Sequence, residues 1–401
     1  YGAIAKAIGD MPRGFVLPPC INQAEMQFIP LADKGKAMYS LNAINGIGDD
    51  VAKAIMDNRP YLSFSDFYQK CVETKLVTTA KVYNLIKGGA FDNLNADRRA
   101  LMIDYVTRVT EEKTKLTTAN IPKLFQYNLI PVEFKDHYIL YSFRKTVFDK
   151  KNLRESINKS TGLYEIPSQV ESYYFEHYDS IFEKAFAVSE DGKYCLNNKE
   201  FDKIYKECIE PLTDWLESKG AVDRYNNYLR SENWNKYCSG STMQWEMESI
   251  CYYTNTHELE IIPLENYIKV SDFFELPKEP VVAETKKWRG RDFNIYKLDV
   301  IAGVVVEKNK NKSMITISTP QGCIDVKLDK GRFAHYDRTV EGDKSWLTRG
   351  NRLVIVGYRR GETFYPKTYN NSVYNHTIMK IEDYNTKEIK FKTERMFIKQ
   401  D

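Results

Sequence analysis

The sequence lacks any uninterrupted apolar run of the roughly 18 residues that a membrane-spanning helix needs. Its seven cysteines are widely spaced and include no CxxC pair, which excludes a disulfide framework and a zinc ribbon. No stretch has the pattern of a signal peptide. These absences predict reduced thiols, no contact with a membrane, and a location in the cytoplasm.

Common catalytic signatures are also missing. The sequence has no KxDG, GxxxxGK or GxSxG motif, which argues against a ligase, a P-loop ATPase and a serine hydrolase. Its five histidines form no HxxxH or HExxH pair that could bind a metal ion. We therefore predict no catalytic residue, no metal site and no cofactor within this chain.

The overall charge gives little indication of a partner, because the formal net charge is only +3. Hydrophobic residues make up 42% of the chain and charged residues 28%, which is typical of folded domains. A length of 401 residues is enough for about two to four domains. Since the chain starts with Tyr1 rather than methionine, we expect a piece of a longer polypeptide whose missing part lies upstream.

The stretch from Leu41 to Ile55 has the pattern of a helix-hairpin-helix. A short first helix, with Leu41 and Ile44 on one face, and a longer second helix flank the turn formed by Gly46, Ile47 and Gly48. Glycines allow positive φ and have no Cβ atom, so the amides of this turn can approach a phosphate. The pattern predicts a contact with the DNA backbone that does not read base sequence. The alternative is a turn that only packs the two helices.

Two acidic residues, Asp49 and Asp50, follow the turn and would weaken a phosphate site, although at a helix start they can also cap amides. Lys53, one helical turn further on, is a candidate for a backbone contact. A weaker second hairpin is predicted at Gly88 and Gly89. Lys87 before it and Arg98 after it complete the set of residues that we expect to contact duplex DNA; the set is Gly46, Ile47, Gly48, Lys53, Lys87, Gly88, Gly89 and Arg98.

Strand-like alternation begins near residue 298 and continues to about 383. Four runs, at 298–307, 314–318, 323–328 and 352–358, and a fifth at 377–381 predict a five-stranded OB barrel with a helical link after the third strand. OB folds usually meet oligonucleotides through two loops, which would here be residues 307–312 and 358–363. The basic residues of these loops are Lys308, Lys310, Lys312, Arg359 and Arg360. Aromatic candidates for base stacking are Phe333, Tyr336 and Tyr358.

A basic stretch precedes the barrel. In it Lys286, Lys287, Arg289 and Arg291 alternate with aromatic residues, so the stretch could neutralise phosphates and stack on unpaired bases. Upstream, residues 113–245 have helical periodicity, with apolar stripes at 174–185 and 201–216, and many acidic residues. DNA would be repelled by such a surface, so we interpret this part as a spacer or as a surface that binds a protein partner.

Several segments together resemble a known family. GFVLPPCIN, LNAINGIGDDVAKAIMDNR, FSDF, LIKGGAFDNL and Arg98 shortly before ALM occur in the order seen after the fingers domain of bacterial DNA polymerase III alpha subunits, the C family of replicative polymerases. WEMESICYYTNTHEL resembles the segment just before the OB domain of that family. It departs from the family pattern at Cys251, where glycine is usual, and at Glu258, where proline is usual.

The resemblance implies an α+β multidomain chain with a tandem helix-hairpin-helix domain, a helical insertion and a C-terminal OB-fold β-barrel. The expected divisions are the tail of a fingers domain (1–37), the tandem helix-hairpin-helix (38–112), the helical insertion (113–262), a basic linker (263–297), the OB domain (298–384) and a C-terminal tail (385–401). They would be the DNA-binding C-terminal region of a bacterial or phage replicative DNA-directed DNA polymerase.

What the family does beyond this chain is also only implied. Nucleotide addition in it uses two Mg²⁺ ions held by palm carboxylates upstream, and no aspartate here falls in their motif, so the chain alone should be inactive. The implied partners are primer–template duplex, single-stranded DNA, the upstream polymerase half, a sliding clamp and other replisome proteins. Two segments, 121–125 and 393–397, have the hydrophobic pair of a clamp-binding peptide but lack its glutamine.

The residues also allow a protein of another class. Helix-hairpin-helix and OB modules occur in non-enzymatic DNA-binding and adaptor proteins of replication and repair, and this chain could be one of them. A third interpretation makes residues 113–245 the main interaction module.

Overall fold

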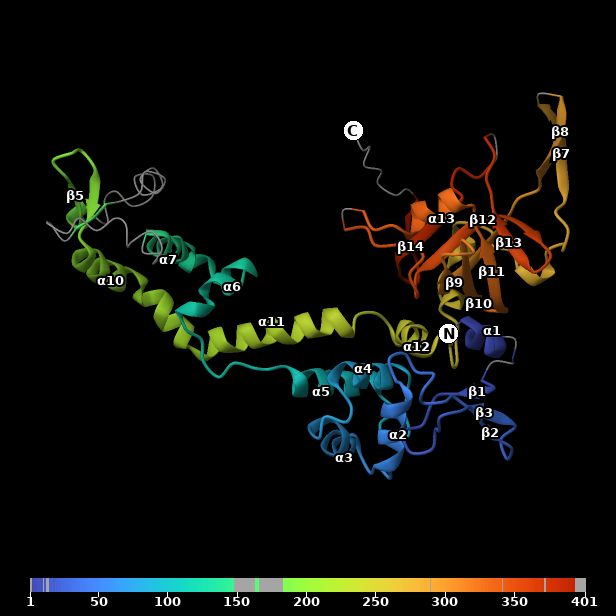
Figure 1. Cartoon of the computed structure of the whole chain (residues 1–401), viewed down its shortest axis with the longest axis horizontal. Helices are drawn as coiled ribbons and strands as arrows, with labels where there is room; N and C mark the ends of the chain where they lie inside the picture. The colour runs from blue at the N-terminus through green and yellow to red at the C-terminus, as the bar shows by residue number, and fades with distance from the viewer. Residues whose placement is uncertain are drawn as a thin grey trace. The chain divides into compact units, whose positions relative to one another are not determined.

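The computed structural model describes residues 2–9, 11, 14–147, 163–165, 183–288, 290–340, 342–370 and 373–393. The chain forms two compact units, Tyr1–Tyr105 with Tyr237–Asp401, and Val106–Lys236. Figure 1 shows helices and sheets in both, which confirms the predicted α+β class. No helix within the described ranges is long and apolar enough to cross a membrane.

The first unit begins with a helix, a small sheet and a helical cluster. The sheet has the order β1-β3-β2. The elements are α1 (Gly2–Gly9), β1 (Val16–Leu17), β2 (Ile29–Leu31), β3 (Lys36–Met38), α2 (Asp49–Asp57), α3 (Phe64–Phe67) with its π-helical continuation η1 (Tyr68–Glu73), α4 (Thr79–Lys87) and α5 (Arg98–Val109). Phe64 holds the cluster together by edge contacts, with ring centroids 5.0 Å from Phe91 and 5.8 Å from Tyr105.

The predicted short helix before the first hairpin is not present. Residues 41–47 instead form consecutive turns, in which the amide of Ile44 donates to Leu41 O at 3.1 Å and the amide of Ile47 donates to Ile44 O at 3.0 Å. Leu41 and Ile44 are nevertheless fully buried. The apolar pattern thus identified the buried side chains correctly but not the backbone conformation between them.

The second part of the first unit is a closed barrel. Its strands are β9 (Asp299–Asn309), β10 (Met314–Thr319), β11 (Gly322–Lys327), β12 (Arg352–Arg360) and β13 (Thr363–Pro366), with α13 (Lys330–Asp337) between β11 and β12. The strand order β13-β11-β10-β9-β12 closes through β12–β13 pairing, and β11 pairs with β13 in parallel. A closed five-stranded barrel with a helix after its third strand confirms the predicted OB fold.

The identity of the fifth barrel strand was predicted wrongly. The barrel is closed by β13, a strand of four residues that ends in Pro366, whereas the predicted strand at 377–381 belongs to β14 (Ile378–Tyr384). β14 pairs with β12 and with β15 (Ile389–Lys392) outside the barrel. A strand this short carries too little alternation to be recognised from sequence.

Short elements join the two parts of the first unit. They are α12 (Thr242–Ile250), the 3₁₀ turns η5 (Glu258–Glu260), η6 (Leu264–Asn266) and η7 (Phe273–Glu275), and the strands β7 (Val282–Trp288) and β8 (Arg291–Tyr296). The stretch at 282–296 is therefore a two-stranded hairpin rather than a linker. Gly290, with φ +78°, lies in its tight turn.

The second unit is mainly helical, as predicted. Its elements are η2 (Thr118–Asn120), α6 (Ile121–Gln126), η3 (Val132–Phe134), α7 (Lys135–Val147), β4 (Tyr164–Glu165), η4 (Glu183–Ala185), β5 (Phe186–Val188), β6 (Tyr194–Leu196), α10 (Asn198–Glu217) and α11 (Lys219–Tyr237). The predicted stripe at 201–216 lies on α10 and is buried at Phe201, Leu212 and Leu216. Most of the other stripe, residues 174–182, lies outside the described residues. The small sheet β4-β6-β5 was not predicted.

Substitution of Gly357 tests the close approach of β12 and β13 that closes the barrel. A Cβ atom at this position of β12 would collide with the backbone carbonyl of Tyr365 on β13 and would lie 2.9 Å from the Phe364 ring. We expect Gly357→Ala to lower the free energy of unfolding by about 1 to 3 kcal/mol or more, since the two strands must separate. Urea unfolding followed by circular dichroism measures the change.

The matched control is Gly331→Ala on α13, where no neighbouring atom is closer than 3.4 Å. This substitution should leave stability unchanged or raise it by about 0.4 to 1 kcal/mol, because alanine restricts the unfolded chain. Equal stability losses in the two variants would contradict the tight β12–β13 approach.

Candidate nucleic-acid interface

The first hairpin turn presents backbone to solvent around one buried side chain. Ile47 is 3% exposed, whereas Gly46 and Gly48 are exposed and Gly46 has φ +77°. Within the described chain, the amides of Gly46 and Gly48 donate to no protein acceptor. Ile47 therefore anchors the turn, and the amides of the two exposed glycines on either side of it are left without a protein acceptor, as phosphate recognition requires.

The start of α2 adds to this surface. Gly48 is the N-cap residue and supplies no side chain to bond the first amides of the helix, which therefore stay available to an anion. Asp49 does not cap them either, because its carboxylate accepts from Asn42 Nδ2 at 3.1 Å. Lys53 is exposed on the next turn of α2, and no described carboxylate pairs with it. The exposed amides and one lysine thus lie beside the two acids, Asp49 and Asp50.

The second glycine pair has a different role. The amide of Gly89 donates to Ile86 O at 3.0 Å and that of Ala90 donates to Leu85 O at 2.9 Å, which is the Schellman pattern at the end of α4. Gly89 has φ +83°, and both Gly88 and Gly89 are buried. A Cβ atom on Gly88 would lie 2.8 Å from Ser249 Oγ. These glycines close a helix against α12, which corrects the prediction that they contact DNA.

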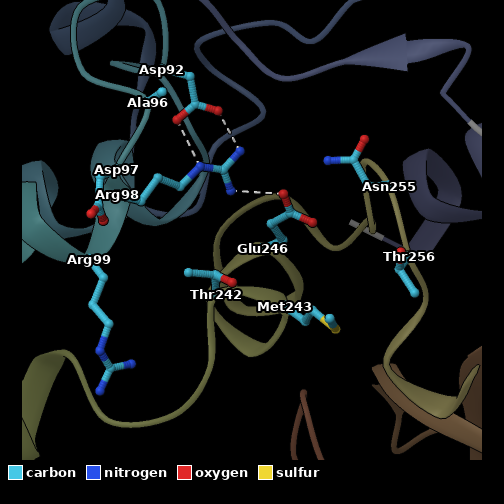
Figure 2. A pocket seen from close by; sticks show the side chains of 10 residues that line it. All are labelled: Asp92, Ala96, Asp97, Arg98, Arg99, Thr242, Met243, Glu246, Asn255 and Thr256. Carbon is cyan, nitrogen blue, oxygen red and sulfur yellow. Dashed lines mark hydrogen bonds and ion pairs between the residues drawn. The ribbon is translucent and has the colours of Figure 1, made fainter. Parts of the chain in front are cut away.

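Lys87 and Arg98 also point into the protein. Lys87 Nζ is 2.6 Å from the Glu248 carboxylate, and Lys87 is only 7% exposed. Figure 2 shows the Arg98 guanidinium between two carboxylates, Asp92 at 2.6 Å and Glu246 at 2.8 Å. Burial acts to lower the pKa of Arg98, but the two carboxylates outweigh it and hold the pKa above its ordinary value. Both residues therefore join α12 to the helical cluster, and the prediction that they contact phosphates is corrected.

A buried carboxylate fixes the other side of the same segment. Glu258 is fully buried and accepts from Gln244 Nε2 at 2.9 Å, from Arg352 Nη1 at 3.0 Å and from Tyr384 OH at 2.9 Å. Arg352 belongs to the barrel strand β12, and Tyr384 belongs to β14, which pairs with β12 outside the barrel. The sequence pointed to Glu258 only as a departure from the family pattern, without indicating its partners. Cys251, the other departure, has φ +55° at the end of α12, a conformation that glycine adopts more easily.

The first OB loop lies where it was predicted, but two of its lysines are paired. Lys308 bonds the Asp337 carboxylate, and Lys310 Nζ is 3.4 Å from it. Burial acts to raise the pKa of Asp337, but hydrogen bonds from Lys308 and Ser345 outweigh it and lower the pKa below its ordinary value. Lys312 is exposed. Of the three predicted lysines, Lys312 is thus the best placed to meet a phosphate.

The second OB loop separates its two arginines. Arg359 is 4% exposed and donates to the carbonyls of Phe273 at 2.9 Å and Leu276 at 3.1 Å, so it is a structural residue and its predicted DNA contact is corrected. Arg360 is exposed, beside Tyr358. Of the other aromatic candidates, Phe333 is buried in the barrel core, and Tyr336 packs against Trp346 at 5.3 Å.

The β7–β8 hairpin keeps its predicted basic residues exposed. Lys286, Lys287 and Arg291 are all at the surface, with Lys286 Nζ 3.3 Å from Glu284. Arg289 lies outside the described residues. The hairpin thus presents cations beside Phe293, whose side chain is 45% exposed.

The usual binding face of the OB fold is partly covered by the chain itself. This face is formed by β10 and β11, where Ser318 Oγ is 3.2 Å from His257 Nε2 and Cys323 Sγ is 3.4 Å from Ala5 O. Asp325 on β11 is ion-paired with Lys6 of α1. No feature of the sequence indicated that α1 would pack here.

The two predicted clamp-binding segments differ in their placement. Ile121 and Leu124 are fully buried in the core of the second unit, so residues 121–125 do not form an accessible peptide. Residues 394–397 of the other candidate lie outside the described residues. Among the described residues, no group of three or more His, Cys, Asp or Glu side chains could hold a metal ion.

An exposed hairpin turn at a helix start, joined to an OB barrel, is an architecture that occurs in DNA-binding regions. The model of the helix-hairpin-helix motif family matches residues 15–101. The probable DNA polymerase YorL of Bacillus subtilis (strain 168) and the DNA-directed DNA polymerase of Bacillus phage SPbeta are each 34% identical to the chain over 396 residues, 95% of this chain and 30% of either relative.

More distant matches are DNA polymerase III alpha subunits. That of Borreliella burgdorferi is 31% identical over 157 residues, 38% of this chain and 13% of the relative, and that of Escherichia coli K12 is 34% identical over 90 residues, 22% and 8%. The chain belongs to the C family of DNA polymerases and corresponds to part of their C-terminal region. The chain spans 30% of the length of the Bacillus subtilis and phage SPbeta relatives.

Substitution of Arg98 tests whether this residue has a structural role or contacts DNA. We expect Arg98→Ala to lower the free energy of unfolding by about 3 to 5 kcal/mol, because it leaves the buried carboxylate of Glu246 unpaired. Thermal and urea unfolding measure the loss. Lys34→Ala, at an exposed position on the β2–β3 turn, should change stability by no more than about 0.5 kcal/mol. A stable Arg98→Ala variant with weakened DNA binding would contradict the internal role.

Proposed function

We propose that this chain grips DNA for a larger replicative polymerase. The hairpin at Gly46–Gly48 holds the duplex backbone, and the OB part handles an unpaired strand. The observation that carries the proposal is the turn at the start of α2, where Ile47 is buried, Gly46 and Gly48 are exposed, and no side chain caps the first amides of the helix. The match of residues 15–101 to a DNA-binding motif family and the polymerase relatives support it.

The contacting set is narrower than the sequence suggests. We propose Gly46, Gly48 and Lys53 for the duplex. For the single strand we propose Lys286, Lys287, Arg291 and Arg360, all of which are exposed. The hairpin binds without reading sequence, since amides and lysines meet phosphates rather than base edges. Asp49 and Asp50 keep its affinity modest, so the duplex is held by several weak contacts together.

The wider activity is part of the proposal. Nucleotide addition, with its Mg²⁺ ions, would take place on carboxylates outside this chain, in the cytoplasm of a bacterium or of a phage-infected cell. A sliding clamp and other replisome proteins are proposed partners. For the clamp, the segment at 393–397 fits better than 121–125, because the apolar anchors of the latter are buried.

Duplex binding can be tested at the hairpin. Gly48→Asp places a carboxylate at the N-cap of α2, where the structure leaves open space and where aspartate favours the helix. It should weaken duplex binding several-fold without loss of stability, because the new charge repels phosphate. Lys53→Glu should lower the slope of log K against log salt by about 1. Fluorescence anisotropy with a labelled duplex at several salt concentrations measures both effects.

The control for this experiment is Lys34→Glu, which makes the same charge change at an exposed lysine on the β2–β3 turn. It should have a smaller effect than Lys53→Glu. Equal effects of the two lysine variants would mean that only net charge matters and that the hairpin is not a specific grip.

A second test concerns catalysis. We expect the purified 401-residue chain to add no nucleotide to a primed template in the presence of Mg²⁺, because its described residues offer no carboxylate cluster for the metal. Primer extension resolved on a denaturing gel is the measurement, with a complete replicative polymerase as the positive control. Template-dependent extension by this chain would contradict the proposal that nucleotide addition takes place outside it.

A further inference from the structure

Three tyrosines from different strands form a row on the outside of the barrel. Tyr358 on β12 lies between Tyr365 on β13, with ring centroids 5.8 Å apart and planes 13° apart, and Tyr296 on β8, at 4.8 Å. All three side chains are partly exposed. Tyrosines gathered in this way offer flat faces to a planar ligand, and each adds contact area at low entropic cost.

One arginine lies over the whole row. The guanidinium of Arg360 is 5.8 Å from the ring centroids of Tyr296 and Tyr358 and 5.9 Å from that of Tyr365. It also donates weakly to Tyr296 OH at 3.4 Å. Arg360 is exposed at the β12–β13 turn, so its charge is held over aromatic faces and in reach of a phosphate.

A groove continues from this row. It has a volume of about 790 Å³ and lies between the β7–β8 hairpin and residues 367–370 and 373–374. Phe293, Tyr369 and Tyr374 line it, and the amide of Tyr296 donates to Tyr369 OH at 3.0 Å, which ties the row to the groove.

The charges around the groove favour a polyanion. Lys286, Lys297 and Lys367 line it, and Lys367 Nζ is 5.6 Å from the Tyr369 ring centroid. Glu284 is the one acidic residue among its lining residues and is 3.3 Å from Lys286. Together with Arg360, the surface combines cations and aromatic faces in the manner of sites that bind unpaired nucleic acid.

The face of β10 and β11, through which OB folds usually bind oligonucleotides, is less open than the tyrosine row and its groove. As described above, α1 and His257 contact the outer side of β10 and β11, and Asp337 pairs two lysines of the first OB loop. A single strand that approaches the barrel therefore meets more exposed aromatic and basic groups at β8, β12 and β13 than on the face that OB folds commonly use.

We propose that an unpaired DNA strand binds along Tyr296, Tyr358 and Tyr365 and enters the neighbouring groove. Its bases stack on the tyrosines and on Phe293, and its phosphates meet Arg360 and Lys367. The proposal rests on the proposed function, since it names the surface through which the OB part holds the single strand. It differs from the usual mode of the OB fold in using the opposite side of the barrel from β10 and its loop.

The test compares two exposed phenylalanines on the same unit. Phe293 in the groove is 45% exposed, and Phe274 on η7, away from the groove lining, is 43% exposed. Binding of a labelled oligothymidylate of about 20 nucleotides to the full 401-residue chain is measured by fluorescence anisotropy. Phe293→Ala and Arg360→Ala together should weaken binding at least about tenfold, whereas Phe274→Ala should change it less than about twofold. Circular dichroism melts confirm that each variant is folded.

Measuring duplex affinity as well shows whether a negative result contradicts only this binding surface or also the proposed function. In the double variant, duplex affinity should stay near that of the parent chain, because the hairpin at Gly46–Gly48 is unchanged. If the parent chain binds the oligothymidylate and the double variant binds it equally well, this surface is overturned and the proposed function stands. If the parent chain binds neither duplex nor single strand, both are overturned.

A second measurement locates the strand directly. An oligonucleotide that carries 5-iododeoxyuridine is photocrosslinked to the parent chain, and the modified residue is mapped by mass spectrometry. Crosslinks at Tyr296, Tyr358 or Phe293 support the proposal, and crosslinks confined to β10, β11 or the loop at 310–313 overturn it.

Discussion

Two buried carboxylates on one short segment determine how the first unit is assembled. Glu246 on α12 bonds Arg98 of the helical cluster, and Glu258, twelve residues later in the chain, bonds Arg352 of the barrel. Each carboxylate has further partners: Thr254 donates to Glu246 from its amide and its hydroxyl, and Tyr384 and Gln244 donate to Glu258. The segment between them therefore holds a helical module and a β-module at once.

Buried ion pairs of this kind do little for net stability, because desolvation of the charges offsets much of their attraction. Their effect is on arrangement. An apolar contact tolerates sliding, whereas a carboxylate with several directed donors is satisfied in one geometry, and any other leaves a buried charge unpaired. The turn at Gly46–Gly48 and the tyrosine row both belong to this one compact unit.

The sequence predicted those features whose causes are local. A turn such as Gly46–Gly48 is specified by neighbouring residues, and the loops of the barrel follow from strand alternation. It failed where a basic side chain is bonded by a group far away in the sequence: Lys87 and the Glu248 carboxylate are 161 positions apart, Arg98 and the Glu246 carboxylate are 148, and Arg359 and the Phe273 carbonyl are 86. A basic residue looks the same in a sequence whether it faces solvent or a distant carboxylate. Tyr365 was missed because it lies on β13, the strand too short to be recognised, where it faces Tyr358. Tyr296 was among the aromatic residues of the basic stretch, but its approach to Tyr358 could not be predicted, because β8 and β12 are far apart in the chain.

The helix α1 has a consequence for the order in which the molecule is made. Its contacts with β11 join positions separated by 318 and 319 residues, as in Ala5–Cys323 and Lys6–Asp325. At a ribosomal rate of roughly 5 to 20 residues per second, α1 leaves the ribosome on the order of 15 to 60 s before the strand that receives it. During that interval the apolar side of α1, with Ala5 and Ile8, has no barrel to cover it. The unit is therefore completed only after its barrel strands have been synthesised and α1 has docked onto β11.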